Sequence, residues 1–305
     1  MDAALIRYRN IVMDNVRWDG FQFRDGDIII STPAKCGTTW LQTICAFLVF
    51  GTTDLPAPVD MLSPWLDQSL RPLDEVVADL TAQNHRRFIK SHTPLDGLPW
   101  DDRVTYITVG RDPRDVALSW DNHMSNLDFN ALIELRGKAV GNEDLAELMG
   151  ELPPPLPELS ERFWAWMGDP STNLGGLATE VHHLRTFWDV RDKPNVILLH
   201  YGELKADLER QMRALAAKLG LDIDEAQWPS LAKAATFDEM KKNAAAVGPN
   251  QSENIWLDRD RFFHKGTNGQ WRDVLVTDED RQRYAARIAE LTDAAFSDWL
   301  HQGAL

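Results

Sequence analysis

The fold is decided by residues 28 to 40, which read Ile28-Ile29-Ile30-Ser31-Thr32-Pro33-Ala34-Lys35-Cys36-Gly37-Thr38-Thr39-Trp40. Three consecutive isoleucines after a turn at Asp25-Gly26 predict a short buried strand. Pro33 and Gly37 mark a loop, and the apolar run from Thr38 to Phe50 predicts a buried helix. A strand, a glycine-containing loop and a helix in this order present backbone N–H groups to an anion, so a phosphate or sulfate site is expected here.

Three other interpretations of this loop are a Walker A loop, a plain helix start and a reactive cysteine. It is not a Walker A loop, because the lysine precedes the glycine by two positions. It could be a threonine-capped helix start with an incidental lysine. A thiolate nucleophile at Cys36 is disfavoured, since a Cys-x5-Arg phosphatase needs arginine where Gln42 stands. We expect Cys36 to be a packed small residue.

Working outward, the remaining elements alternate between strands and helices. Such alternation predicts an α/β fold with a mostly parallel central sheet flanked by helices, in which ligands bind at the carboxyl ends of the strands. We expect one domain over 1–305, with 121–185 as a helical insert or lid. One continuous C-terminal helix is predicted from apolar residues at helical spacing, Tyr284, Ile288, Leu291, Ala295 and Trp299. The four strands, the first included, are predicted at Asp27–Ser31, Arg87–Lys90, Val104–Val109 and Val196–His200.

Composition limits the partners of this chain. It has 305 residues, 44% of them hydrophobic, and a formal net charge of −15. Nucleic acids and anionic membrane surfaces need a broad basic face, so neither is an expected partner. An anionic ligand would need basic residues gathered locally.

Two cysteines, Cys36 and Cys45, support neither a disulfide framework nor a zinc site. The N-terminus shows no signal-peptide core, and the longest apolar run, 44–50, is far shorter than the roughly 20 residues of a membrane span. A soluble cytoplasmic protein without a transmembrane segment is therefore expected.

Candidate functional side chains follow two further predicted strands. His92 comes just after the strand that ends at Lys90, where it could act as a general base, although a lone histidine is more often a loop or core residue. Arg111 ends the next strand, and Ser119 lies eight residues on, so that both could reach one phosphate. The alternative is a surface cluster in which Asp112 and Asp115 pair with the arginines.

A fourth segment reads Arg261-Phe262-Phe263-His264-Lys265-Gly266-Thr267-Asn268-Gly269-Gln270-Trp271-Arg272. Two glycines three apart, with basic residues on both sides, could close a backbone nest over an anion. Taken alone this signal is weak.

Together these segments resemble, in order and spacing, the four motifs of the cytosolic-type sulfotransferases, which use 3′-phosphoadenosine 5′-phosphosulfate (PAPS). The resemblance covers roughly 19–299 and implies their P-loop nucleotide-kinase-like fold. The segments at 65–67 and 111–115 look closest to actinobacterial members, for which glycolipid or phenolic acceptors are expected.

The resemblance also implies roles for individual residues. Lys35 would lie on the sulfate–phosphate bridge, His92 would take the proton of the acceptor, and Lys90 would assist His92 and the sulfuryl group that is transferred. Arg111 and Ser119 would bind the 3′-phosphate. The remaining cofactor-binding positions would be Cys36, Gly37, Thr38 and Thr39 around the 5′-phosphate, Trp40, Tyr201, Thr236 and Phe237 near the nucleoside, and Phe263, His264, Lys265 and Gly266 over the 3′-phosphate.

The sequence departs from the family pattern at several positions. Cys36 replaces a usual serine, Ala235 a threonine, and Arg272 a lysine. His264 stands where an arginine usually binds the 3′-phosphate. The dimer motif of the family would fall on 272–281 but is incomplete there, so a homo-oligomer is possible but not indicated.

The implied reaction is direct in-line transfer from PAPS to a hydroxyl of a phenol, sterol or glycolipid, with adenosine 3′,5′-bisphosphate (PAP) as the product. No metal is implied, because lysines would take the part that Mg²⁺ plays in phosphoryl transfer. Trp120, Trp164 and Trp166 could line an apolar acceptor pocket or belong to the core of the insert. The alternatives are a nucleotide kinase of related topology and a nucleotide-binding protein without catalysis.

Overall fold

The computed structural model describes residues 5–150, 156–168, 175–248, 254–263 and 266–303. Its centre is a four-stranded, all-parallel sheet with the strand order β2-β1-β3-β4. The strands are β1 (Ile28–Ser31), β2 (Phe88–Ser91), β3 (Thr105–Gly110) and β4 (Val196–His200). Each lies within one residue of its predicted bounds, and the predicted α/β class is confirmed.

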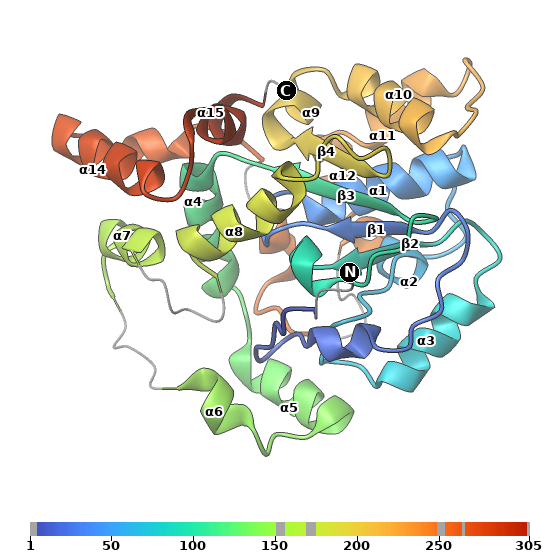
Figure 1. Ribbon diagram of the computed structural model, residues 1–305, viewed down its shortest axis with the longest axis horizontal. Coiled ribbons are helices and arrows are strands. Elements are labelled where there is room, and N and C mark those ends of the chain that lie inside the picture. The colour runs from blue at the N-terminus through green and yellow to red at the C-terminus, as the bar shows by residue number, and fades with distance from the viewer. Residues whose placement is uncertain (1–4, 151–155, 169–174, 249–253, 264–265, 304–305) are drawn as a thin grey trace.

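Helices cover both faces of this sheet (Figure 1). In chain order they are α1 (Thr38–Phe50), α2 (Val59–Leu62), α3 (Leu73–Ala82), α4 (Pro113–Met124), α5 (Phe129–Val140), α6 (Leu145–Met149), α7 (Leu159–Gly168), α8 (Leu177–Trp188), α9 (Tyr201–Ala206), α10 (Leu208–Leu219), α11 (Trp228–Ala234), α12 (Phe237–Lys242), α13 (Ala244–Val247), α14 (Asp278–Ala289) and α15 (Ala294–Gln302). Short 3₁₀ helices are η1 (Asn15–Trp18), η2 (Leu95–Gly97), η3 (Arg259–Phe262) and η4 (Gln270–Asp273).

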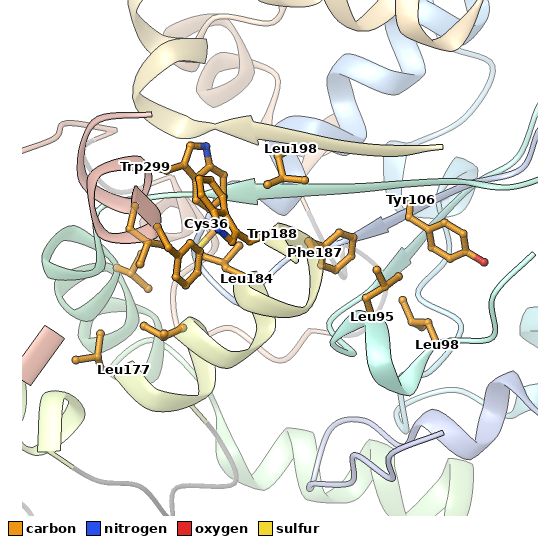
Figure 2. Close-up of a cluster of buried hydrophobic side chains, with 14 of the residues drawn as sticks. Cys36, Leu95, Leu98, Tyr106, Leu177, Leu184, Phe187, Trp188, Leu198 and Trp299 are labelled. Carbon is orange, nitrogen blue, oxygen red and sulfur yellow. The ribbon is translucent and has the colours of Figure 1, made fainter. Parts of the chain in front are cut away.

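The two faces of the sheet belong to two separate hydrophobic clusters, because successive side chains of a strand point to opposite faces. Ile29 packs on the side of α8 and α15, together with Trp188 and Trp299, and Figure 2 shows this cluster around Cys36. Ile28 and Ile30 pack on the side of α1 and α10. A strand buried on both faces explains the uninterrupted run of isoleucines.

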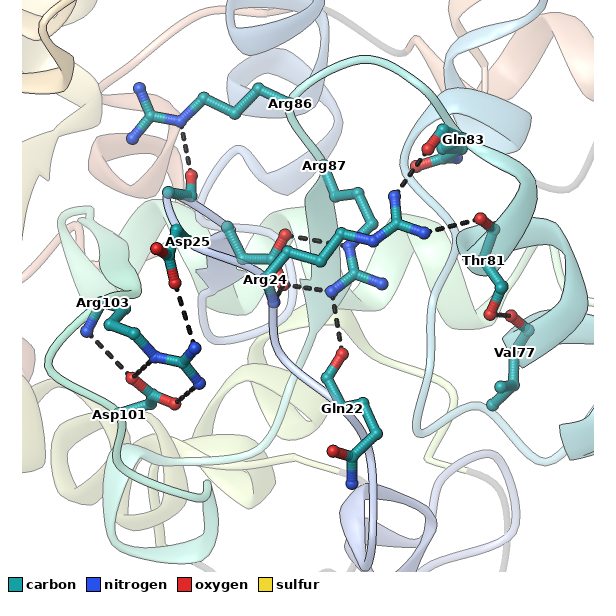
Figure 3. Close-up of polar contacts among 12 residues, drawn as sticks. Gln22, Arg24, Asp25, Val77, Thr81, Gln83, Arg86, Arg87, Asp101 and Arg103 are labelled. Carbon is teal, nitrogen blue, oxygen red and sulfur yellow. Dashed lines mark hydrogen bonds and ion pairs between the residues drawn. The ribbon is translucent and has the colours of Figure 1, made fainter.

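Arginines fasten the amino-terminal edge of the sheet. The guanidinium of Arg87 lies buried against the carboxylate of Asp27, with Nε 2.9 Å from Oδ1, and it also donates to the carbonyl of Gln22 (Figure 3). Arg24 donates to the carbonyls of Thr81 and Gln83 at the C-terminal end of α3. The charged contacts of this edge therefore hold the scaffold and leave the opposite edge for function.

The prediction of one continuous C-terminal helix is wrong. The structure has two helices, α14 and α15, separated by a break at 290–293. The Asp293 side chain accepts a hydrogen bond of 2.9 Å from the N–H of Phe296 and so caps a new helix. Apolar residues on both helices still reach one cluster, which is why their spacing looked continuous. Helix α4 begins at Pro113, behind the cap Asp112, whose side chain accepts from the N–H of Arg114.

Candidate functional site

The carboxyl ends of the four strands open into one cavity of about 660 Å³. Each strand delivers a candidate residue to its wall directly or through the following loop: Lys35 after β1, His92 after β2, Arg111 after β3 and Tyr201 after β4. These residues are up to 166 positions apart in the chain (201 − 35). The parallel topology brings them together, as expected for ligand sites of such sheets.

The loop after β1 has the backbone shape of an anion cradle. Lys35 and Gly37 adopt left-handed conformations, with φ of 70° and 109°. A Cβ on Gly37 would lie 3.1 Å from the Tyr201 ring, so a side chain here would be crowded as well as strained. Gly37 precedes α1 without a side-chain cap, and the Thr38 hydroxyl lies 2.6 Å from that of Thr32. The first-turn N–H groups of α1 therefore face no capping side chain, which suits an anionic ligand.

Positive charge is concentrated at this loop. Burial, together with the charges of Arg111 and Lys90, lowers the pKa of Lys35 to about 7. Its ammonium lies 5.0 Å from the centre of the Phe262 ring. A bound anion would offset the repulsion among these cations and favour the charged form of Lys35.

Arg111 is aimed at the cradle. Its Nη1 donates to the Lys35 carbonyl at 2.9 Å, and its guanidinium lies over the Tyr201 ring at 4.3 Å. The buried Nε finds no hydrogen-bond partner among the residues that the structure describes. The Asp112 carboxylate pairs with Arg114 at 2.7 Å, so the surface-cluster interpretation holds for Arg114 and not for Arg111. Ser119, on the next turns of α4, lines the same cavity.

One ring nitrogen of His92 makes a hydrogen bond to the backbone, and the other is available as a proton acceptor. Its Nδ1–H donates to the Thr32 carbonyl at 2.7 Å, which leaves the lone pair on Nε2. Burial and the Lys90 charge hold the pKa of His92 well below its usual value, so the ring is neutral at pH 7. Trp65 contacts both groups, with its ring centre 4.8 Å from that of His92 and 4.2 Å from the Lys90 ammonium. A neutral, oriented imidazole beside a lysine can act as a general base.

Aromatic residues form the other side of the cradle. Trp40 donates to the Ala235 carbonyl at 2.8 Å and meets Tyr201 edge-to-face at 5.0 Å. Phe237 and Phe263 lie 6.0 Å apart, and both line the cavity. Thr39 lines it too.

Three predicted site residues lie elsewhere or behind the wall. Thr236 is exposed, and its hydroxyl caps α12. Cys36 is buried below the loop, and its thiol donates to Glu180 at 3.6 Å. Gly266 packs on Phe237, where a Cβ would lie 2.5 Å from the ring. His264 and Lys265 lie outside the described residues.

Several wall residues were missed by sequence reasoning. Residues 7–13 near the N-terminus line the cavity, as do Trp65, His123 and Glu180. The Asp115 carboxylate, which was considered only as an arginine partner, accepts the N–H of Gly269 at 2.8 and 2.9 Å and ties the glycine segment to α4. No local pattern marks residues 7–13, because only the fold brings them to the site.

The tryptophans of the predicted insert divide between the two interpretations. Trp120 and Trp166 line the cavity. Trp164 instead packs beneath the Arg283 guanidinium at 3.9 Å, against the core cluster of α8. Apolar residues of α5 and of the segment before it, Leu127, Phe129 and Leu132, extend the cavity wall.

Within the described parts of the chain, no group of three or more His, Cys, Asp or Glu side chains could hold a metal ion. No described helix is long and apolar enough to cross a membrane.

Comparisons with known proteins agree on one family. The family described as "Sulfotransferase domain" matches residues 25–297. A glycolipid sulfotransferase of Mycobacterium bovis is 43% identical, over 97% of this chain and 94% of its own length. Mouse sulfotransferase 1B1 is 25% identical, over 87% of this chain and 83% of its own.

Solved structures agree on the fold. Retinol dehydratase, in complex with androsterone and PAP, superposes with a TM-score of 0.69 at 21% identity and covers 92% of this chain and 87% of that one. A mouse sulfotransferase in complex with PAP gives a TM-score of 0.67 at 20% identity, with 93% and 90% covered. The predicted P-loop-like fold is confirmed.

Proposed function

The chain belongs to the sulfotransferase family, and from that membership we propose that it moves the sulfuryl group of PAPS to a hydroxyl of an apolar or glycolipid acceptor. One observation carries the proposal: the ends of three parallel strands, β1, β2 and β3, bring Lys35, Lys90, His92 and Arg111 to a single cavity. Relatives of the same fold were crystallised with PAP, the product that PAPS would leave. A relative at 43% identity is named a glycolipid sulfotransferase.

The residues present fit the proposed nucleotide. The left-handed turn at Lys35 and Gly37 offers backbone N–H groups to the 5′-phosphosulfate. The buried Arg111 Nε, without a partner among the described residues, offers a donor to the 3′-phosphate, and Ser119 on α4 lines the same cavity. Trp40 and Phe237 would enclose the base.

The proposed reaction is a direct displacement at sulfur. The acceptor oxygen bonds to sulfur while the bond from sulfur to the bridging phosphate oxygen breaks, and the acceptor proton passes to Nε2 of His92. Thr32 keeps the imidazole oriented through Nδ1. Lys35 and Lys90 stabilise the charge that develops on the bridging and sulfuryl oxygens. Because the cradle and the base sit on rigid strand ends, the reacting groups are held in place before they meet.

The apolar part of the cavity supports an acceptor with a hydrophobic portion. Its wall combines the N-terminal segment, with Ile11 and Met13, and residues after α4, with Leu127 and Phe129. A wall of this kind suits a lipid tail or a fused-ring body better than a small polar alcohol. The acidic chain, with its net charge of −15, is consistent with a small-molecule acceptor and not with nucleic acid.

The decisive test is whether the site recognises the ribose 3′-phosphate. Wild type should bind PAP at least about a hundredfold more tightly than AMP, because without the phosphate Arg111 stays buried and unpaired at a cost of roughly 3 kcal/mol. Arg111→Ala should remove most of this preference and change AMP affinity little. Titration calorimetry with both ligands measures the effect.

A control variant is Arg103→Ala, which alters an exposed arginine paired with Asp101 at the far edge of the sheet (Figure 3). It should keep the preference for PAP. Equal binding of PAP and AMP by wild type would refute PAPS as the sulfuryl donor.

A further inference from the structure

A histidine in the acceptor half of the cavity has a buried polar atom to which no described residue is hydrogen-bonded. His123 lies near the end of α4, and its ring is set between two tryptophans, 5.7 Å from the Trp120 centre and 5.1 Å from the Trp256 centre. All three residues line the cavity. The Nδ1 atom is buried and makes no hydrogen bond to any residue that the structure describes. A buried polar atom of this kind is costly unless a ligand or water completes it.

His123 is close to the reacting groups. The charges of Lys35 and Lys90, and His92 as well, all act to lower its pKa, and burial is the largest cause of the shift. The imidazole is therefore neutral at pH 7 and offers one donor and one acceptor nitrogen. A hydroxyl, which can donate and accept, matches it. An ammonium group does not match this site, because the positive charges of Lys35 and Lys90 already lie near it.

The surroundings of His123 suggest the shape of its ligand. Indole rings flank it, and the cavity continues past them to the apolar residues Leu127 and Phe129. A sugar ring has apolar C–H faces that pack on aromatic rings and hydroxyls at its edge that need polar partners. A sterol or a simple phenol has only one hydroxyl, which the proposed reaction places at His92.

We propose that His123 is a specificity-determining residue that binds a second hydroxyl of the acceptor, so that the enzyme favours a polyol headgroup such as a sugar with an apolar tail. This inference rests on the proposed sulfuryl transfer. It adds that one hydroxyl of the acceptor meets His92 while a neighbouring hydroxyl pairs with Nδ1 of His123. Trp120 and Trp256 hold the sugar ring of the acceptor between these two hydroxyl contacts.

The test compares two acceptors that share an eight-carbon tail, octyl β-glucoside and para-octylphenol. For wild type and His123→Phe, kcat/KM is measured for each with PAPS. Phenylalanine keeps the aromatic packing and removes both nitrogens. The ratio of kcat/KM for the glucoside to that for the phenol should fall by about 10- to 100-fold, as expected for one lost hydrogen bond to a buried group.

Two more variants separate recognition from packing. His123→Asn places an amide where Nδ1 lies and should restore part of the ratio. His85→Phe changes a histidine that is not part of the cavity wall and whose Nδ1–H donates to the Arg86 carbonyl at 3.0 Å, and it should leave the ratio unchanged. PAP affinity, measured for every variant, shows whether the fold is intact.

The outcomes distinguish this inference from the function on which it rests. An equal change of kcat/KM for both acceptors in His123→Phe, or wild-type transfer to the phenol alone, would overturn the role of His123 and leave the sulfuryl transfer standing. Transfer to neither acceptor by wild type, despite tight PAP binding, would contradict the proposed transferase function itself.

Discussion

At the scale of single residues, the proposed base owes its state to the backbone and to its neighbours. The Thr32 carbonyl fixes the protonated nitrogen of His92, and burial next to Lys90 keeps the ring neutral. Together they leave Nε2 unprotonated, as a proton acceptor on a residue that lines the cavity. A histidine with the same sequence neighbours on an exposed loop would have neither property.

His92→Asn should therefore abolish transfer and spare nucleotide binding. The asparagine amide can still donate to the Thr32 carbonyl, but it cannot take a proton, so the single-turnover rate should fall by roughly 10²- to 10⁴-fold. PAP affinity should stay near that of wild type. The pKa of His92 lies well below 6.5, and a bound anion keeps Lys35 charged, so the single-turnover rate of wild type saturated with PAPS should also hold between pH 8 and pH 6.

His85→Asn is the matched control, because it alters a histidine that is not part of the cavity wall. It should keep most of the rate. If His92→Asn retained most of its turnover, His92 would not be the base.

At the scale of elements, the site depends on ties between segments far apart in the chain. Asp115, on the first turn of α4, holds the Gly269 N–H through both carboxylate oxygens. Gly269 has a φ of 81° and precedes η4, so this bond fixes a glycine turn that no regular element supports. Asp115 thus links the strand end that carries Arg111 to the C-terminal glycine segment.

Asp115→Ala should loosen this segment and weaken PAP binding. Without the carboxylate, residues 266–273 lose their hydrogen bonds to α4 and keep the stacking of Arg114 on Trp271, so hydrogen exchange in this stretch should accelerate. PAP affinity should fall about tenfold, the equivalent of roughly 1.4 kcal/mol. Titration calorimetry and hydrogen-exchange mass spectrometry measure the two effects.

Asp273→Ala serves as the control for this experiment, since Asp273 lies exposed at the end of η4. It should change neither quantity. Unchanged exchange at 266–273 in Asp115→Ala would show that the tie does not order the segment.

At the scale of the whole molecule, a buried carboxyl group in the cavity wall makes the stability of the folded protein depend on pH. Glu180 on α8 is 3% exposed, accepts the Cys36 thiol through Oε1, and has no partner for Oε2 among the described residues. Burial raises the pKa of Glu180 well above its usual value. The folded protein therefore holds a proton on Glu180 that the unfolded chain releases above about pH 4.5.

Glu180→Gln should stabilise the protein at alkaline pH. Because the folded state binds the extra proton, wild-type stability falls as pH rises above 4.5, by up to about 1.4 kcal/mol per pH unit, until the folded pKa is reached. Glutamine is neutral in both the folded and the unfolded protein, so the variant does not lose stability in this way as pH rises. Urea unfolding at pH 4.5, 6 and 8 should show the variant gaining over wild type as pH rises.

Glu147→Gln, at an exposed glutamate of α6, should differ little from wild type at any of these pH values. A gap between Glu180→Gln and wild type that did not grow with pH would mean that Glu180 is ionised in the folded protein.

The sequence by itself determined the strands, the first helix and the principal loop. A short run of isoleucines closed by proline and glycine has few other structures available, because a strand buried on both faces must be apolar throughout. Helix α1 ends at Phe50 as predicted. The candidates Lys35, His92 and Arg111 could be found because parallel strands place their carboxyl ends at one edge.

Only the tertiary structure decided what completes the cavity. Residues 7–13, His123, Trp65 and Glu180 reach it from four separate segments, and no local period encodes such a meeting. The break between α14 and α15 was hidden because both helices bury residues in one cluster, whereas the cap at Asp293 depends on a single side chain. Local sequence fixes dihedral preferences and burial patterns over a few turns; contacts between distant segments are set by the packing of the whole chain.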